Sequence, residues 1–243
     1  MRKNFVLSIV CIFVFSFLIT AKANAGRIVI DNDEWTLWDS GFSGPNDPGQ
    51  FVTNVASFFS GGTPGGTFAN ASGILGSQAI ATLTSAGYTV ENVSTSGLTL
   101  AQLQAYKGLF LGGGGGYPSS SMLTDYVNGG GNVYIAGGTG AGGDWQWNPF
   151  LNNFGLQLAN SYNGIEGSMS IVSANPIFNG VDHLYQYSGQ TVSPYGSNPN
   201  AQVLINGLYG VYTSPAPVPI PGALLLFGPG LAGLAALRQR FTI

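Results

Sequence analysis

Two short apolar runs, each followed by glycines, mark the centre of the chain. Residues 109–111 and 133–136 show little polar alternation, which is typical of strands that are covered on both faces, as in a parallel sheet. The segment 119–128 between them begins with serines, carries apolar residues at helical spacing and ends at Asn128-Gly129, as helices do. The pattern therefore predicts one right-handed strand–helix–strand unit.

Similar patterns extend on both sides of this unit. Strands are predicted at 27–31 and 88–93, and helices at 50–59, 75–86, 99–106 and 147–154. Further along, short strands are predicted at 168–172, 184–187, 202–205 and 209–212, with a helical turn within 175–181. The alternation predicts an α/β fold, a three-layer flavodoxin-like open parallel sheet with strand order 2-1-3-4-5. The later strands predict an antiparallel C-terminal β extension at one edge.

The first 25 residues read as a secretory signal peptide. Arg2 and Lys3 form a positive region, 5–19 an apolar region, and Ala23-Asn24-Ala25 a small-residue cleavage site. The alternative is a retained membrane helix, for which the apolar run is short. Cleavage after Ala25 would also remove Cys11, the one cysteine, so no disulfide or thiol chemistry is expected in the mature domain.

The other end of the chain predicts a membrane segment. A proline-rich stretch at 214–221 precedes sixteen residues, 222–237, that contain no charge. As a helix they would rise about 24 Å, slightly less than the roughly 30 Å hydrocarbon core. The arginines that follow are expected on the cytoplasmic side, which leaves the domain outside.

This tail, 215–243, resembles the PEP-CTERM sorting signal of Gram-negative bacteria. The residues that carry the resemblance are Val218, Pro219, Pro221, Gly222, Arg238 and Arg240. The resemblance implies recognition by an exosortase-type membrane transpeptidase. It also implies transient anchoring in the inner membrane, followed by transfer to the cell surface or extracellular space. The alternative is a plain C-terminal anchor.

Charge and composition narrow the chemistry of the domain predicted at 26–214. It contains ten acidic residues, and its only bases are Arg27 and Lys107, so nucleic acid and anionic membrane surfaces should be repelled. One histidine without cysteine cannot complete a zinc, copper, haem or iron–sulfur site, and no cofactor is expected. Weak calcium candidates are Asp31, Asp33 and Glu34, although the Asp-x-Asp-x-Asp-Gly spacing is missing.

The domain also resembles the class I glutamine amidotransferase-like superfamily, and in particular exported PEP-CTERM proteins built on that fold. The resemblance rests on residues 33–37, 125–134, 137–140, 147–156 and 175–181. It implies the fold and the destination, but no known activity, because the elbow at 137–140 lacks the catalytic cysteine. Thr139 is the only hydroxyl there, and a Thr139–His183 pair is less favoured than a surface histidine. The motif Gly-x-Gly-x-x-Gly at 138–143 also suggests a dinucleotide site, but Asp144 would oppose the phosphates.

Aromatic residues follow the predicted strands where their carboxyl ends would share one rim. Trp35 and Trp38 follow the first strand, Tyr117 the third, and Trp145 and Trp147 the fourth. With Asp33, Glu34, Thr139 and Asp144, they predict a surface that stacks on sugars. The alternative is that the tryptophans pack the loops onto the sheet. The favoured hypothesis is a non-catalytic exported protein that contacts exopolysaccharide, and the rival is an extracellular glycan hydrolase.

Overall fold

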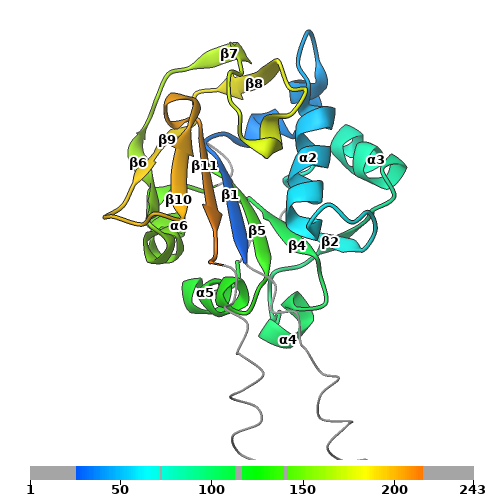
Figure 1. The fold of residues 1–243 in the computed structure, drawn as a ribbon, viewed down its shortest axis with the longest axis vertical. Coiled ribbons are helices and arrows are strands. Elements are labelled where there is room, and N and C mark those ends of the chain that lie inside the picture. The colour runs from blue at the N-terminus through cyan, green and yellow to red at the C-terminus, as the bar shows by residue number, and fades with distance from the viewer. Residues whose placement is uncertain (1–25, 72, 113–116, 139–141, 216–243) are drawn as a thin grey trace, which may run out of the picture.

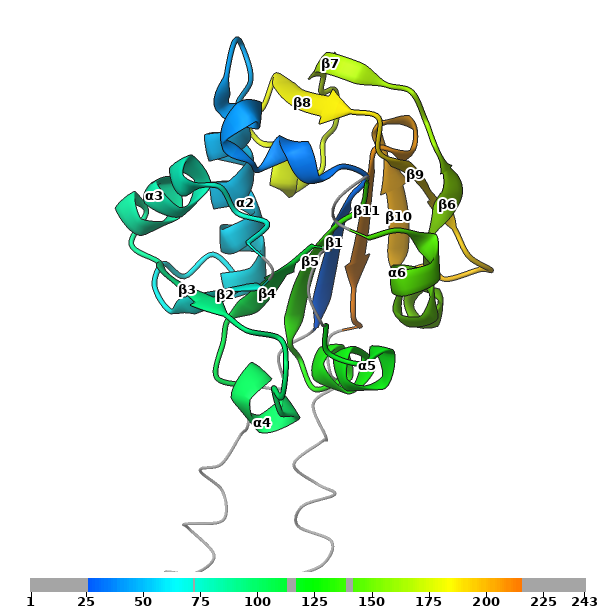
Figure 2. The same ribbon diagram turned by 180° about the vertical axis from the view of Figure 1, so that it is seen from behind.

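The computed structural model describes residues 26–71, 73–112, 117–138 and 142–215. The predicted signal peptide, the predicted sorting tail from 216 onwards and Thr139 lie outside these residues. In the described part, no helix is long and apolar enough to span a membrane. The fold is α/β, with helices on both faces of a mostly parallel central sheet (Figures 1 and 2).

The strands alternate with helices through the first two thirds of the chain. The strands are β1 Arg27–Asp31, β2 Thr67–Ala71, β3 Thr89–Val93, β4 Gly108–Leu111, β5 Asn132–Ala136, β6 Leu156–Tyr162, β7 Glu166–Ser170, β8 His183–Tyr187, β9 Gln190–Pro194, β10 Ala201–Leu204 and β11 Tyr209–Thr213. The α-helices are α2 Pro48–Ser60, α3 Ser77–Ser85, α4 Leu100–Leu103, α5 Ser120–Asn128 and α6 Asp144–Leu151. Short 3-10 turns are η1 Glu34–Thr36, η2 Asp39–Phe42, η3 Asn152–Phe154, η4 Pro176–Phe178 and η5 Ile205–Gly207.

The sheet separates two hydrophobic cores. Val29, Phe110 and Tyr134 point to the core beneath α2 and α3, while Ile28 and Ile135 point to the core beneath α4, α5 and α6. Alternate residues of one strand thus serve opposite faces, as a pleated strand requires. Because both faces are covered, the central strands read as uninterrupted apolar runs, and their prediction is confirmed.

The order of the strands differs from the predicted one. The sheet runs β10-β11-β1-β5-β4-β2-β3, so the five parallel strands, counted along the chain, lie in the order 1-5-4-2-3. The predicted order 2-1-3-4-5 is wrong. One cause is β2, a strand that the sequence pattern did not reveal, which pairs in parallel with both β3 and β4.

The C-terminal segment adds antiparallel strands, as predicted. β11 pairs with β1, and β10 pairs with β11, which extends the sheet at that edge. β7 pairs with β8 in a separate two-stranded sheet. The pair formed by β6 and β9 was not predicted.

The carboxyl and amino edges of the sheet differ in their chain connections. At the carboxyl edge, the chain leaves β1 toward α2 on one face and leaves the neighbouring β5 toward α6 on the other. Such a reversal between adjacent parallel strands is where open α/β sheets bind ligands. At the amino edge, β1 begins and β11 ends, joined by a hydrogen bond from Ser214 N to Gly26 O of 2.8 Å.

Candidate functional site

A pocket of about 420 Å³ lies at the carboxyl edge, beside the end of β5. The turn from β5 to α6 supplies Gly138, Gly142 and Gly143, and the first turn of α6 supplies Asp144, Trp145 and Gln146. The end of β6, the start of β9 and the segment after β4 complete it with Asn160, Ser161, Tyr162, Gln190 and Tyr117. Four separate segments of the chain therefore converge where the topology predicts a ligand site.

Buried amides form the polar part of the pocket. Gln146 is 8% exposed and Gln190 is 5% exposed. Three atoms of these amides have no hydrogen-bond partner among the described residues: Nε2 and Oε1 of Gln146, and Oε1 of Gln190. A buried polar group without a partner costs about 1–3 kcal/mol, so a ligand that supplies hydroxyl groups here would recover part of that cost.

Exposed aromatic rings flank these amides. Trp145 is 73% exposed and Tyr162 is 55% exposed, although both are large and largely apolar. Tyr117 and Asp144 are partly exposed at the same pocket. Flat aromatic faces beside amides and a carboxylate are the usual components of a sugar-binding surface.

Glycine is required where the turn approaches its neighbours. Gly142 has φ +83°, and a Cβ there would overlap Oε1 of Gln146. A Cβ at Gly138, where φ is +117°, would overlap Oε2 of Glu34. Glu34 is 4% exposed, so its carboxylate lies behind the pocket wall. The side chains of both predicted candidates, Glu34 and Asp144, thus lie at or next to this turn.

Trp147 does not belong to the exposed rim. It is 1% exposed, its ring lies 5.2 Å from that of Tyr117, and it packs in the core beneath α6. The prediction placed Trp145 and Trp147 in or beside a loop, but both lie within α6. Two residues apart on a helix, they point in nearly opposite directions, so Trp145 faces outward and Trp147 inward. Trp147 is therefore a core residue.

Asp33 and Trp35 form a different group, which packs against β8. The Asp33 carboxylate accepts hydrogen bonds from Trp35 N, at 3.0 Å, and from Tyr187 N. The Trp35 ring lies 5.3 Å from that of Tyr187 and 5.4 Å from that of Trp38. Asp33 and Trp35 do not line the pocket, so the predicted single rim is divided into two aromatic groups.

Asp31 lies at the centre of a buried polar network below this edge. Its Oδ2 accepts a 2.8 Å hydrogen bond from Tyr134 Oη, and Gln186 Nε2 links Thr36 Oγ1 and Tyr209 Oη at 3.1 and 2.8 Å. Burial, reinforced by the charge of Asp33, raises the pKa of Asp31 well above its usual value. Burial also raises the pKa of Asp33 to about 6. This network fixes the end of β1 and the loop after it.

The carboxylates after β1 do not form an evident metal site. Among the described residues, no three His, Cys, Asp or Glu side chains are grouped so that they could hold a metal ion. The calcium candidates Asp31 and Asp33 are instead engaged by Tyr134 and by backbone amides. His183 begins β8, where its backbone amide donates to Asp47 Oδ2 at 3.1 Å. The proposed partner Thr139 lies outside the described residues.

Several pocket residues were missed by sequence reasoning. Tyr162 and Asn160 lie on β6, a strand that was not predicted, and Gln190 begins β9, which was also missed. Gln146 could have been noticed, because it sits between two tryptophans directly after the glycine turn. Fold and site together define an α/β protein with an aromatic and amide-lined pocket at the carboxyl edge of its sheet. Comparisons with protein-family models, curated proteins and solved structures found no match.

Proposed function

We propose that this chain is an exported cell-surface or extracellular-matrix protein whose α/β domain binds exopolysaccharide without catalysing a reaction. The observation that carries the proposal is that the buried Gln146 amide and the buried Oε1 of Gln190, which have no hydrogen-bond partner among the described residues, line the same pocket as the exposed rings of Trp145 and Tyr162. Aromatic rings stack on the apolar faces of sugars, and amides both donate to and accept from hydroxyl groups. One polysaccharide segment would satisfy both.

Export and sorting are supported by the sequence. The signal-like segment 1–25 and the tail with Val218, Pro219 and Pro221 fit a protein that an exosortase-type membrane enzyme transfers to the surface. We propose this export route together with a flavodoxin-like fold and an amidotransferase-like ancestry for the domain. The absence of a cysteine after residue 11 supports a domain without amidotransferase chemistry.

The second candidate is an extracellular glycan hydrolase. It is favoured by Asp144 in the pocket and by Glu34 against Gly138. Glycosidases usually use two carboxyl groups about 5–10 Å apart on either side of the scissile bond. Of the described pocket residues, only Asp144 carries a carboxylate, which favours binding over hydrolysis. Release of reducing ends that disappears in Asp144→Asn would establish the hydrolase instead.

The test compares two exposed tyrosines. Tyr162, at the pocket, is 55% exposed, and Tyr195, outside it, is 49% exposed. We expect Tyr162→Ala to weaken retention of the full chain on polysaccharide from the producing cells by about tenfold, because a stacked ring contributes on the order of 1 kcal/mol or more. Tyr195→Ala should bind like the unmodified chain. Equal losses, or no loss in Tyr162→Ala, would reject the pocket as the binding site.

A further inference from the structure

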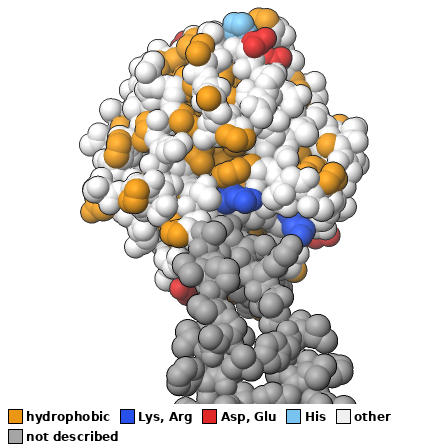
Figure 3. All heavy atoms as spheres, in the orientation of Figure 1, with side chains coloured by type: hydrophobic (Ala, Val, Ile, Leu, Met, Phe, Trp, Pro, Cys, Tyr) orange, Lys and Arg blue, Asp and Glu red, His pale blue; other side chains and the backbone are white. Residues whose placement is uncertain are grey.

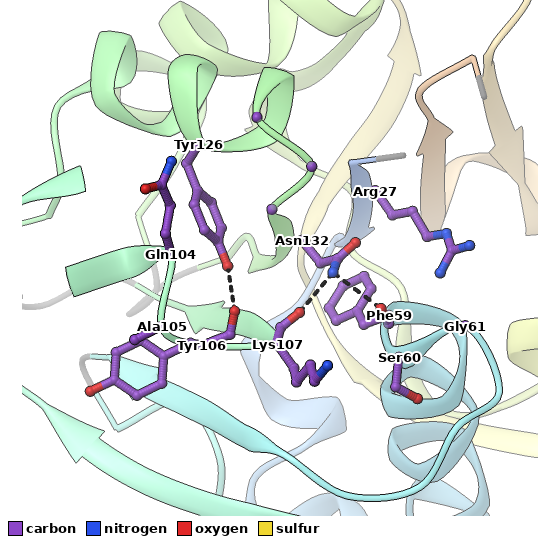
Figure 4. A pocket seen from close by; sticks show the side chains of 13 residues that line it. Arg27, Phe59, Ser60, Gly61, Gln104, Ala105, Tyr106, Lys107, Tyr126 and Asn132 are labelled. Atoms are coloured by element: carbon purple, nitrogen blue, oxygen red, sulfur yellow. Dashed lines mark hydrogen bonds between the residues drawn. The ribbon is translucent and has the colours of Figure 1, made fainter. Parts of the chain in front are cut away.

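A second pocket, of about 440 Å³, opens at the opposite, amino edge of the sheet. Its walls are the end of α2, residues 104–107 before β4, the glycine turn 129–131 before β5 and the first residues of β1 and β5. Figure 4 shows Arg27, Lys107 and Ser60 on the α2 side of this pocket, with Tyr126 and Gln104 on the other side.

Both basic residues of the predicted domain line this one pocket. Among the described residues, Arg27 and Lys107 are the only Lys or Arg, and they are the two blue side chains at the lower end of the domain in Figure 3. None of the described lining residues is acidic. Outside the pocket, the Glu91 carboxylate accepts a 3.1 Å hydrogen bond from Oη of the lining residue Tyr106. The described part of the chain, which has an excess of acids, thus places its two Lys and Arg residues at one cavity.

The cations are held in place but retain donors. The Arg27 guanidinium lies 4.9 Å above the Phe58 ring, and its Nη1 donates to Phe58 O, while its buried Nε has no partner among the described residues. Burial lowers the pKa of Arg27, and no carboxylate offsets that burial. The Lys107 stem packs against Gly66, and the residue itself is exposed. Both can still donate to an anionic group.

The same pocket also contains a buried acceptor. Asn132 is 6% exposed, and its Nδ2 donates to Phe59 O at 3.2 Å and to Lys107 O at 2.7 Å. These bonds fix the amide, and its Oδ1 has no partner among the described residues. In Figure 4 the oxygen points away from these two bonds, toward the Arg27 side. The carbonyl ends of α2 and α5 also lie at this edge, and their partial negative charge favours the cations Arg27 and Lys107 there.

A ligand must therefore offer both an anionic group and hydroxyl donors. An anion without hydroxyl groups would engage the cations but leave Asn132 Oδ1 without a donor, and a neutral sugar would leave the partly buried Arg27 guanidinium without a counter-charge. We propose that this pocket binds an acidic sugar, with its carboxylate at Arg27 and Lys107 and a hydroxyl group donating to Asn132 Oδ1. This pocket shares no lining residue with the carboxyl-edge pocket, so an experiment can reject one binding proposal and leave the other standing.

Calorimetric titration of the full chain in detergent micelles, with galacturonate, galactose and acetate, tests the proposal. Galacturonate should bind, and galactose and acetate should each bind at least about tenfold more weakly, since galactose lacks the carboxylate and acetate lacks the hydroxyl donors. Raising the salt concentration should weaken galacturonate binding. Galactose or acetate binding as tightly as galacturonate would overturn the proposal.

Three variants complete the test. Lys107→Gln, at an exposed position, should weaken galacturonate binding by roughly tenfold, the loss of one charge-assisted hydrogen bond. Glu91→Gln is the matched control of opposite sign, because removal of a nearby negative charge should leave binding unchanged or tighter. Tyr162→Ala should leave it unchanged, which separates this site from the proposed polysaccharide pocket. Unaltered binding in Lys107→Gln, or an equal loss in Glu91→Gln or Tyr162→Ala, would refute the assignment.

Discussion

The two tryptophans of α6 give the sharpest test of which aromatic residues are structural. Trp147 is 1% exposed and packs against Tyr117, whereas Trp145, two residues earlier on the same helix, is 73% exposed. Truncation of a buried tryptophan to alanine typically costs about 3–5 kcal/mol, through lost burial and the cavity left behind. Truncation of an exposed side chain without buried partners stays within about 0.5 kcal/mol. Trp147→Ala should therefore destabilise the protein strongly, and Trp145→Ala should not.

Urea unfolding followed by far-UV circular dichroism measures the two free energies without relying on tryptophan fluorescence. For a domain of this size, 1 kcal/mol corresponds to about 2–4 °C in Tm, so Trp147→Ala should melt roughly 6–20 °C lower. Trp147→Phe keeps most of the ring and should lose less than Trp147→Ala. In the proposed function, Trp145→Ala lowers polysaccharide binding at unchanged stability. A loss of more than about 2 kcal/mol in Trp145→Ala, or less than about 1 kcal/mol in Trp147→Ala, would refute this division.

Three further outcomes are expected. The folded pKa of Asp33, about 6, exceeds its ordinary value of 3.8, so the folded state retains the proton to higher pH, and the free energy of unfolding should fall by about 2 kcal/mol as pH rises from 4 to 7; urea titrations should show this slope reduced in Asp33→Asn. Gly142→Ala should abolish polysaccharide retention, because its Cβ overlaps the Gln146 amide, whereas Gly62→Ala, with a similar φ of +79° and open space around it, should retain binding. The tail beyond residue 215 should be removed only in cells that contain the exosortase-type enzyme; equal sizes on immunoblots with and without it would contradict sorting.

Local sequence patterns determined most individual elements. The strands β1, β4 and β5 are short apolar runs whose every residue meets a core or a neighbouring strand, and α5 carries its serine cap and terminal glycine in the sequence. Elements of this kind are set by periodicity and capping, which act over a few residues. That Arg27 and Lys107 are the only bases of the predicted domain could be counted from the sequence, but their meeting in one pocket could not be predicted from it.

Tertiary structure decided the strand order, the pairing of β6 with β9 and the composition of the site. β2 escaped prediction because Asn70 interrupts its apolar pattern; buried in the sheet, this side chain is satisfied by Asn92 Oδ1, at 2.8 Å, on the adjacent strand. Such a partner is invisible to a local pattern, since hydrogen bonds across strands join residues far apart in the chain. The same reason separates Trp145 from Trp147: both are aromatic residues after a strand, and only the packing of α6 against the sheet decides which one meets solvent.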